Sequence, residues 1–437
     1  MRLRHPARDR GKKVVVVAGG GFGGLNAAKE LARHPEVQVL LFDQRNHHLF
    51  QPLLYQVASA GLNPADIAVP IRAQFSEQSN VEVHLGKIDA VDFDQQVVIG
   101  GGYEVEYDYL VLGLGAQHSY FGHPEWEDFA PGLKTLEQAT EIRRRVLSAF
   151  ETAENAEDPT LLHASLTFVI VGGGPTGVEM AGAIADISRT VIVADFRRID
   201  PSRARILLVE AAPRILAACP EELAAHAQRD LEEIGVEVRT NAMVEHIDAD
   251  GVVVAGERIA AKTVVWAAGV QASRVEFRPP IELDRAGRVR AQPDLSVPGH
   301  PNAFVVGDLA ALTLPDGRNL PGVAPAAIQT GRHAARMIMH DIRHQPREAY
   351  RYKDKGLMAT IGKSRAIALS GRLRLTGRPA WFAWLFVHVY YLIGFKNRLL
   401  VLWQWAWSYL FSKRGARLIT EREWRLGGAA RPSDGGA

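Results

Sequence analysis

Cysteine is almost absent from this sequence, because the 437 residues include only Cys219. A lone thiol cannot form an intrachain disulfide, a CxxC redox pair or a thiolate metal cluster. Reactions that need paired redox cysteines are therefore excluded, and no metal site is expected. We expect Cys219 to pack as a small apolar side chain.

A long apolar run is also missing. Residues 1–12 are basic but contain no apolar core of signal-peptide length, so we expect a disordered basic arm there. The tail holds two aromatic-rich runs without formal charge, Trp381–Phe395, with 15 residues, and Leu399–Phe411, with 13. A spanning helix needs about 20 residues. Joining the runs would place Lys396 and Arg398 in the bilayer centre, at about 2.5–3.5 kcal/mol each.

Acidic residues are absent from 355–420, where eleven Lys or Arg and five of the eight tryptophans lie. Tryptophan prefers the membrane interface, and cations bind anionic lipid headgroups. A buried core helix or a dimer interface would explain the apolar residues but not the cations. We therefore expect two interfacial helices that form a monotopic anchor over 376–420, followed by a flexible tail, 421–437. Some of the aromatic surface is left for a homodimer, and no nucleic acid partner is expected.

Two segments of the sequence resemble each other. VVVVAGGGFGG begins at Val14 and FVIVGGGPTG at Phe168, and each joins a β-branched run to a glycine cluster and a helical pattern. Two such strand–turn–helix units predict two Rossmann-like, doubly wound α/β domains. The near balance of 51 basic and 49 acidic residues indicates no partner by itself.

The first glycine cluster fits GxGxxG. Gly19 allows a tight turn, Gly21 lets a pyrophosphate approach the backbone, and Gly24 lets the helix pack on the strand. Asp43 ends the next strand, where a carboxylate can accept hydrogen bonds from both ribose hydroxyls. This combination predicts a dinucleotide site.

The second cluster has the same form, with Gly172, Gly174 and Gly177 in place and Glu210 at the end of the next strand. The spacing to the acid is longer because of an extra stretch, 187–205, whose role the pattern does not indicate. Two clusters imply two nucleotides, which favours electron transfer between two cofactors.

Three shorter segments are strands that run into small residues. They are VLGLGA, which ends at Ala116, VVWAAGV, which contains Gly269, and VVGDLA, which contains Asp308. Each could be an ordinary turn. Together with the glycine clusters they predict a cofactor cleft.

The order of these elements predicts that the second domain is inserted in the first. We expect the first domain over 13–125 and 290–370 and the second over 163–285.

The order of the motifs resembles the flavoproteins with two dinucleotide-binding domains, and further segments resemble the type II NADH dehydrogenases, which are non-pumping NADH:quinone oxidoreductases. The segments are Asn46–Arg72, Gly174–Gly182, Leu320–Ala335, Asp354–Ala366 and the aromatic tail. The resemblance implies FAD in the first domain, NADH in the second, a membrane quinone (ubiquinone or menaquinone) as acceptor, and attachment to the cytoplasmic face of the cell inner membrane. The related disulfide reductases and sulfide:quinone oxidoreductases need the cysteines that this chain lacks.

The resemblance also implies roles for individual residues. FAD is expected to contact Gly19, Gly21, Gly24, Asp43, Gln51, Pro52, Ala116, Asp308 and Lys355. NADH is expected to contact Gly172, Gly174, Gly177, Glu210 and Gly269. Glu179 and Gln329 are the candidate catalytic residues, and Gln51, Pro52 and Gln329 are expected near the quinone entrance. Pro325 stands where many relatives have glutamine, so the polar contact to quinone differs here.

Hydride transfer needs orientation and exclusion of water more than acid–base groups. Glu179 is expected to bind the nucleotide or to gate the two half-reactions, although an acid early in a helix is also favoured by the helix dipole. His47, His48 and water are candidate proton donors for the quinone. The alternatives are a soluble NAD(P)H–flavin reductase that feeds a small protein carrier, which the apolar tail disfavours, and a redox sensor without fast turnover.

Overall fold

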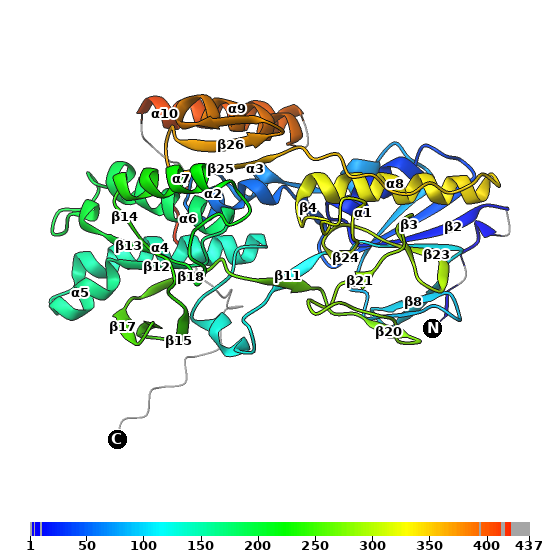
Figure 1. The fold of residues 1–437 in the computed structure, drawn as a ribbon, viewed down its shortest axis with the longest axis horizontal. Helices are drawn as coiled ribbons and strands as arrows, with labels where there is room; N and C mark the ends of the chain where they lie inside the picture. The colour runs from blue at the N-terminus through cyan, green and yellow to red at the C-terminus, as the bar shows by residue number, and fades with distance from the viewer. Residues whose placement is uncertain (1, 4, 9–10, 393–394, 412–415, 421–437) are drawn as a thin grey trace, which may run out of the picture.

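The computed structural model describes residues 2–3, 5–8, 11–392, 395–411 and 416–420. The expected flexible tail, 421–437, lies outside this set. Two α/β units lie side by side along the molecule, and the C-terminal helices lie on top of one of them (Figure 1). The expected pair of Rossmann-like units is confirmed.

The first unit is built on a six-stranded sheet in the order β22–β23–β10–β2–β3–β6. Its valine-rich strands are buried because helices and a second sheet cover its faces, as parallel sheets require. Helices α1 and α8 pack against each other on this unit. The bounds are β2 Lys13–Ala18, α1 Phe22–Leu31, β3 Val37–Asp43, β6 Val81–Leu85, β10 Tyr109–Leu112, β22 Ser296–Val297, β23 His300–Val305 and α8 Ala324–Ile342.

The first unit also contains a second sheet, with strands in the order β1–β9–β8–β7–β20. Its strands are β1 Arg2–Leu3, β7 Ala90–Asp92, β8 Val97–Gly100, β9 Tyr103–Glu106 and β20 Glu276–Arg278. The described part of residues 1–12 is thus not the disordered arm that we expected. Strand β1 pairs with β9, and the Arg8 guanidinium lies 2.6 Å from the Glu106 carboxylate, which neutralises its charge.

The second unit repeats the plan with a parallel sheet in the order β14–β13–β12–β18. Its parts are β12 Thr167–Val171, α6 Pro175–Asp186, β13 Arg205–Val209, α7 Glu221–Glu233, β14 Val236–Arg239 and β18 Thr263–Trp266. An antiparallel sheet follows, with β15 Val244–Asp248, β16 Gly251–Val254 and β17 Glu257–Ala260. Helices α4 Leu136–Asn155 and α5 Pro159–Ser165 lead into the unit.

A two-stranded antiparallel ribbon joins the units. Strand β11, Ala116–His118, carries the chain out of the first unit, and β19, Val270–Ala272, brings it back. The return comes earlier than the expected boundary at 285, because β20 already pairs with β7 of the first unit. Long-range strand pairing of this kind leaves no mark in local composition.

The segment Asn46–Arg72 reaches from the first unit toward the second. It contains β4 His47–Leu49, η2 Gln51–Leu53, α2 Leu54–Ala58, α3 Pro64–Ile67 and β5 Ala68–Pro70, and η3 Arg72–Phe75 follows. Strands β4 and β5 pair with each other, and α2 packs against α4 and α6 of the second unit. This segment therefore forms part of the interface between the units.

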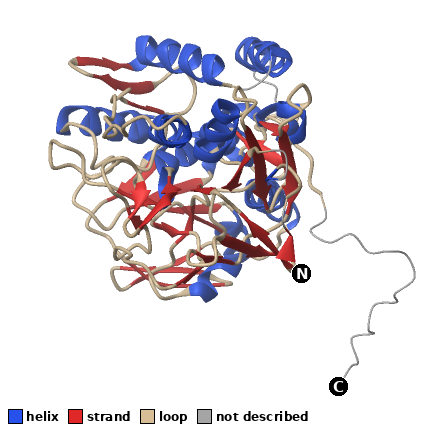
Figure 2. Cartoon of the chain, turned by 90° about the vertical axis from the view of Figure 1, so that its right-hand side faces the viewer, coloured by secondary structure: helices blue, strands red, loops and turns tan. Residues whose placement is uncertain are grey.

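The C-terminal part begins with an antiparallel sheet of β25 Leu357–Thr360, β26 Ala366–Ser370 and β27 Leu373–Thr376, followed by α9 Gly377–Tyr391 and α10 Phe395–Phe411. Although we expected residues up to 370 to belong with the first unit, β25 packs on α6 and β26 on α7. Figure 2, which views the molecule along its long axis, shows helices gathered above the strand layers.

The two C-terminal helices are not a detached anchor. Trp384 of α9 and Val401 of α10 are buried in the same core as α2, α4 and α6. The opposite faces are apolar and exposed, with Phe382, Phe386, Tyr390, Leu399, Leu402, Trp403 and Trp407 at the surface. None of the helices in the described part of the chain has the length and apolarity to cross a membrane.

The extra stretch 187–205 continues α6 as a π-helical turn, η5 Ile187–Val191, and returns through η6 Pro201–Arg203. Glu154 of α4 accepts hydrogen bonds from the backbone of Arg197 and Ile199 and holds this loop. Asp195 forms an ion pair with Arg417, so the loop also binds the chain after α10.

Candidate active site

The first glycine loop connects β2 to α1. Gly19 has a φ of +103°, and a Cβ atom there would lie 2.3 Å from the carbonyl oxygen of Gly113. A Cβ at Gly24 would lie 1.8 Å from the carbonyl oxygen of Gly19. Gly21 differs, because a Cβ there would meet no atom within 4 Å. The loop is therefore closed toward the protein and open at Gly21, where a bound pyrophosphate would lie.

The second glycine loop, between β12 and α6, has the same geometry. Gly172 has a φ of +108°, and a Cβ at Gly177 would lie 1.8 Å from the carbonyl oxygen of Gly172. Gly174, the N-cap of α6, again faces open space. Gly269, with a φ of +74°, follows β18 and lies against the Phe121 ring. The chain thus presents two cradles of one design.

Each loop is held by the acid that ends the following strand. Asp43 accepts hydrogen bonds from the backbone N–H of Gly20, at 2.6 Å, and of Arg45, at 2.7 Å. Glu210 accepts from Gly173 at 2.6 Å and from Ala212 at 2.7 Å. Burial raises the pKa of Asp43, and the two N–H groups act against that rise. Since each carboxylate oxygen has two lone pairs, both acids retain acceptor capacity for a ribose hydroxyl.

His48 lies against the first loop with an unsatisfied atom. Its Nδ1 donates to the carbonyl oxygen of Gly20 at 2.9 Å, and its ring packs edge-on against Phe22. The side chain is buried, and Nε2 has no hydrogen-bond partner among the described residues. Burial lowers the pKa of His48 to about 4. The ring is therefore neutral near pH 7, which makes it a poor proton donor but a good acceptor for a ligand hydroxyl.

Ala116 and Asp308 follow β10 and β23, which are neighbouring strands of the first sheet. Asp308 is in the short helix η7, Gly307–Leu309, and Ala116 begins β11. Burial lowers the pKa of Lys134, and the Asp308 carboxylate acts against that lowering. Lys134 was not predicted from the sequence, because a single lysine before a helix carries no local signal.

The residues expected near the quinone entrance lie on two elements. Gln51 and Pro52 begin the short helix η2, directly after Phe50, whose ring contacts Phe22 of the first loop. Gln329, on α8, uses both ends of its amide on one residue: Nε2 donates to the carbonyl oxygen of Lys353 and Oε1 accepts from its N–H, each at 3.0 Å.

Gln329 therefore fixes the segment that leads to Lys355, which is exposed.

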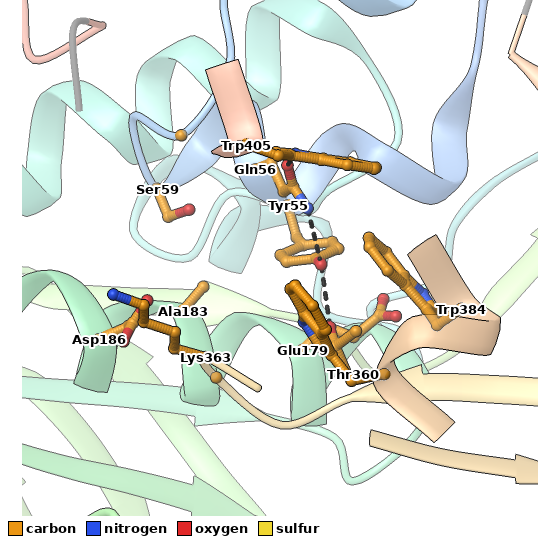
Figure 3. A pocket seen from close by; sticks show the side chains of 13 residues that line it. Tyr55, Gln56, Ser59, Glu179, Ala183, Asp186, Thr360, Lys363, Trp384 and Trp405 are labelled. Atoms are coloured by element: carbon orange, nitrogen blue, oxygen red, sulfur yellow. Dashed lines mark hydrogen bonds between the residues drawn. The ribbon is translucent and has the colours of Figure 1, made fainter. Parts of the chain in front are cut away.

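Glu179 lines a cavity between the second unit and the C-terminal helices. The walls come from α2, α6, the turn after β25, α9 and α10 (Figure 3). The Glu179 side chain is half-buried, and desolvation by the surrounding protein raises its pKa to about 8, against the lowering effect of the Thr360 backbone N–H. A carboxyl group with this pKa holds a proton near neutral pH and can release it.

The sequence pattern did not single out most of the other residues that line this cavity. They include Tyr55 and Gln56 of α2, Thr360 of β25, and Trp384 and Trp405 of the C-terminal helices. They come from four elements of the chain, and only folding brings them together.

Metal chemistry finds no support in the geometry. Within the described residues, no three histidine, cysteine or acidic side chains are grouped to hold an ion. Cys219 is buried, and burial raises the pKa of its thiol, so the reactive thiolate is disfavoured.

Two cradles of this design, one in each unit, define a nucleotide-dependent oxidoreductase class. Residues 12–331 match the family described as pyridine nucleotide-disulphide oxidoreductase. The chain belongs to that family, although its single cysteine excludes the disulfide chemistry of the family's name.

Within that family, the chain is a member of the type II NADH:quinone oxidoreductases. It is 43% identical over 434 residues to "Type II NADH:quinone oxidoreductase Ndh" of Mycobacterium tuberculosis, covering 96% of this chain and 92% of the relative. A protein from Staphylococcus haemolyticus with the same description is 28% identical over 86% of this chain and 94% of its own length. The fold is similar to that of NDH2 from Plasmodium falciparum solved in complex with NADH, with a TM-score of 0.85, 17% identity, and coverage of 94% of this chain and all of that one.

Proposed function

We propose that this protein transfers a hydride from NADH to bound FAD and then two electrons to a membrane quinone, without pumping protons. The observation that carries the proposal is the pair of matching cradles, each closed by one glycine and open at another. Two nucleotide sites joined by a short ribbon suit electron transfer between two cofactors.

For FAD, the first cradle supplies Gly19, Gly21 and Gly24, with Asp43 as the ribose acceptor. The unsatisfied Nε2 of His48 supports a hydroxyl-bearing ligand beside this loop. The remaining contacts that we propose are Gln51, Pro52, Ala116, Asp308 and Lys355.

For NADH, the second cradle supplies Gly172, Gly174 and Gly177, and Gly269 gives close approach at the facing strand end. Glu210 is proposed to accept from the ribose hydroxyls and to repel the extra phosphate of NADPH. Arg214, which is half-buried nearby, donates to the carbonyl oxygen of Ala217 at 3.1 Å.

The reaction balances as NADH, one proton and quinone giving NAD⁺ and quinol. Bound flavin supplies the two-electron chemistry, while the protein binds, orients and excludes water. Glu179 is the proposed carboxyl group that holds or releases a proton beside the nucleotide. Gln329 is proposed to act by fixing the Lys353–Lys355 segment beside the flavin.

The exposed aromatic faces of α9 and α10 are proposed to lie on the cytoplasmic leaflet of the inner membrane. Phe382, Phe386 and Tyr390 repeat every four residues and so form one stripe of α9. Arg372 and Arg378 are exposed near this stripe and can bind anionic lipid headgroups. Part of the same surface can serve a homodimer.

The direct test compares acceptors under steady-state conditions. The purified holoenzyme is given NADH with a short-tailed ubiquinone or menaquinone analogue, or with a small iron–sulfur protein carrier. Fast NADH oxidation with the quinones and slow oxidation with the carrier supports the proposal. A preference for the protein carrier indicates a soluble flavin reductase instead, and slow oxidation with every acceptor indicates a sensor.

A further inference from the structure

A series of three hydrogen bonds links the last helix to Thr360, which lines the cavity of Glu179. Trp405 of α10 donates its indole Nε1–H to Oε1 of Gln56 at 2.7 Å. Gln56 donates through Nε2 to the Tyr55 hydroxyl at 3.0 Å, and that hydroxyl lies 2.9 Å from Oγ1 of Thr360 (Figure 3). Thr360 and Glu179 line the same cavity, and the backbone N–H of Thr360 acts to lower the pKa of the Glu179 carboxyl group.

The donor and acceptor types give the series a direction. An indole N–H can only donate, so the Gln56 oxygen must accept and its NH₂ group is left to donate. The Tyr55 oxygen then accepts from Gln56, which favours donation of its own proton to Thr360. Hydrogen bonds arranged head to tail polarise one another, so the loss of one weakens the others.

Aromatic packing covers part of this series. The Trp384 ring contacts both of the other rings, with centroids 5.5 Å from Trp405 and 6.5 Å from Tyr55. Trp384 is only 2% exposed. The Tyr55–Thr360 hydrogen bond is buried and the other two are partly buried, so the dielectric is lowest at the Thr360 end, where the hydrogen bond is stronger than at the surface.

The same helix that begins the series carries the exposed apolar face. Trp403 and Trp407 are 67% and 46% exposed, whereas Trp405 between them points inward to Gln56. Trp405 therefore fixes α10 on the protein, while Trp403 and Trp407 of the same helix can contact an apolar phase.

We propose that Trp405, Gln56 and Tyr55 are positioning residues that transmit the seating of α10 to the Glu179 carboxyl group through Thr360. This inference rests on the proposed function, since it concerns how the same site is tuned. When α10 is seated, Thr360 is held so that its N–H stabilises the carboxylate. When α10 loosens, that contact weakens and the carboxyl group retains its proton to higher pH.

Adsorption of the exposed face to a bilayer would favour the seated state, so the protein would ionise Glu179 more readily when bound to a membrane. The proposed coupling runs through a contiguous set of contacts from the Trp405 indole to the Thr360 hydroxyl.

The experiment is an infrared pH titration of the FAD-loaded, full-length protein in detergent. The carboxyl band that disappears in Glu179→Gln is assigned to Glu179. Among the described residues, the other ionisable groups lining the cavity are Tyr55 of α2, Asp186 of α6 and Lys363 after β25, while α9 and α10 contribute indoles only. Their contribution remains in the Glu179→Gln reference and is subtracted.

Tyr55→Phe removes one hydroxyl, and Trp405→Phe removes one N–H while keeping an aromatic ring against Trp384. Each is expected to raise the midpoint of the Glu179 band by at least half a pH unit. The double variant is expected to show the same shift rather than the sum, because both changes break one series. Trp403→Phe, the matched change on the exposed face of α10, should leave the midpoint in place.

The proposal is overturned if Tyr55→Phe and Trp405→Phe keep the wild-type midpoint, if their shifts add, if Trp403→Phe shifts it equally, or if no band is lost in Glu179→Gln. Flavin content and melting temperature identify any variant that fails to fold, and Gln56→Met then replaces it as a third break in the series. A shared shift in a protein whose flavin NADH does not reduce would refute the proposed function and leave this coupling standing. Normal turnover with unchanged midpoints would support the proposed function and refute this coupling.

Discussion

At the scale of single residues, glycines with the same sequence signature have different physical roles. Gly19 and Gly24 are required by the backbone itself, because any Cβ would overlap a carbonyl oxygen. Gly21 and Gly174 are not required by the protein, since the space beside them is open. Close approach of a ligand to the backbone explains glycine at these two positions.

Alanine at the open glycines should therefore affect ligands and not folding. Gly21→Ala is expected to keep its melting temperature without added FAD but to lose at least tenfold in FAD affinity. Gly174→Ala should retain FAD and raise the KM for NADH at least tenfold. Flavin absorbance per chain and steady-state kinetics measure both effects.

Gly24→Ala is the control, because its methyl group would meet the Gly19 oxygen at 1.8 Å. It should destabilise the protein by several kcal/mol, as overpacking of a rigid backbone contact does. Equal stability losses in Gly21→Ala and Gly24→Ala would contradict the assignment of the open cradle.

Glu210 should determine the choice of nicotinamide nucleotide. Glu210→Gln removes the negative charge but keeps one acceptor oxygen for the loop. We expect kcat/KM for NADH to fall about tenfold, in line with the loss of a charge-assisted hydrogen bond, and that for NADPH to rise or stay level. Equal efficiency of the wild-type protein with both nucleotides would reject this role.

Glu179 should make stability depend on pH. Its folded-state pKa, about 8, lies above the ordinary value of 4.5, so its contribution is fully present below pH 4.5 and is lost as the pH rises through 8. Glu179→Gln removes this loss. Between pH 5 and pH 9 the variant should gain stability relative to the wild type, by about 1–3 kcal/mol. If the stability difference between the variant and the wild type is the same at pH 5 and pH 9, the Glu179 carboxyl group does not have the raised pKa that the structure indicates.

The sequence predicted the residues whose roles are local. Gly19, Gly24, Asp43 and their counterparts act on atoms of their own loop, and the local spacing reveals them. Lys134, Tyr55 and Trp405 could not be found in this way, because their partners Asp308, Thr360 and Gln56 are far away in the chain.

At the scale of elements, periodicity and composition identified the parallel strands and long helices, since buried β-branched runs and glycine loops are local signals. The lengths of the uncharged runs likewise predicted two helices in the tail. What composition could not show is that each helix has two apolar faces, one packed on the core and one exposed. Ala380 and Trp384 of α9 are buried, while Phe382 and Phe386 are exposed.

The exposed faces should control membrane binding without affecting the fold. A Phe386→Asp, Trp403→Asp double variant is expected to lose 10²-fold or more in partition onto anionic vesicles, because each aromatic side chain contributes about 1.5–3 kcal/mol of burial. It should keep FAD and its reduction by NADH. Vesicle flotation measures the partition.

Leu161→Asp serves as the matched control, since Leu161 is exposed on α5 at a distance in sequence from the tail. It should bind vesicles like the wild type. High salt should only partly release the wild-type protein, because apolar burial persists when charges are screened. Unchanged flotation of the double variant would contradict the membrane assignment.

At the scale of the whole molecule, the ribbon of β11 and β19 joins the two units that carry the nucleotide cradles. The segment Asn46–Arg72 reaches from the first unit to the second, and the C-terminal helices pack on the second unit. The inserted order of the units was predictable from the repeat. Their boundaries were not, because β20 returns to the first unit and β25 packs on the second through contacts between distant segments.

The central claim is that one chain carries out two half-reactions through one flavin. Anaerobic double-mixing measures this most directly, with NADH added first and a quinone analogue second while flavin absorbance is followed. The account predicts that one equivalent of NADH per chain bleaches the flavin and that the quinone then restores its absorbance, both faster than steady-state turnover. A flavin that NADH leaves oxidised, or a reduced flavin that quinone cannot reoxidise, would contradict it.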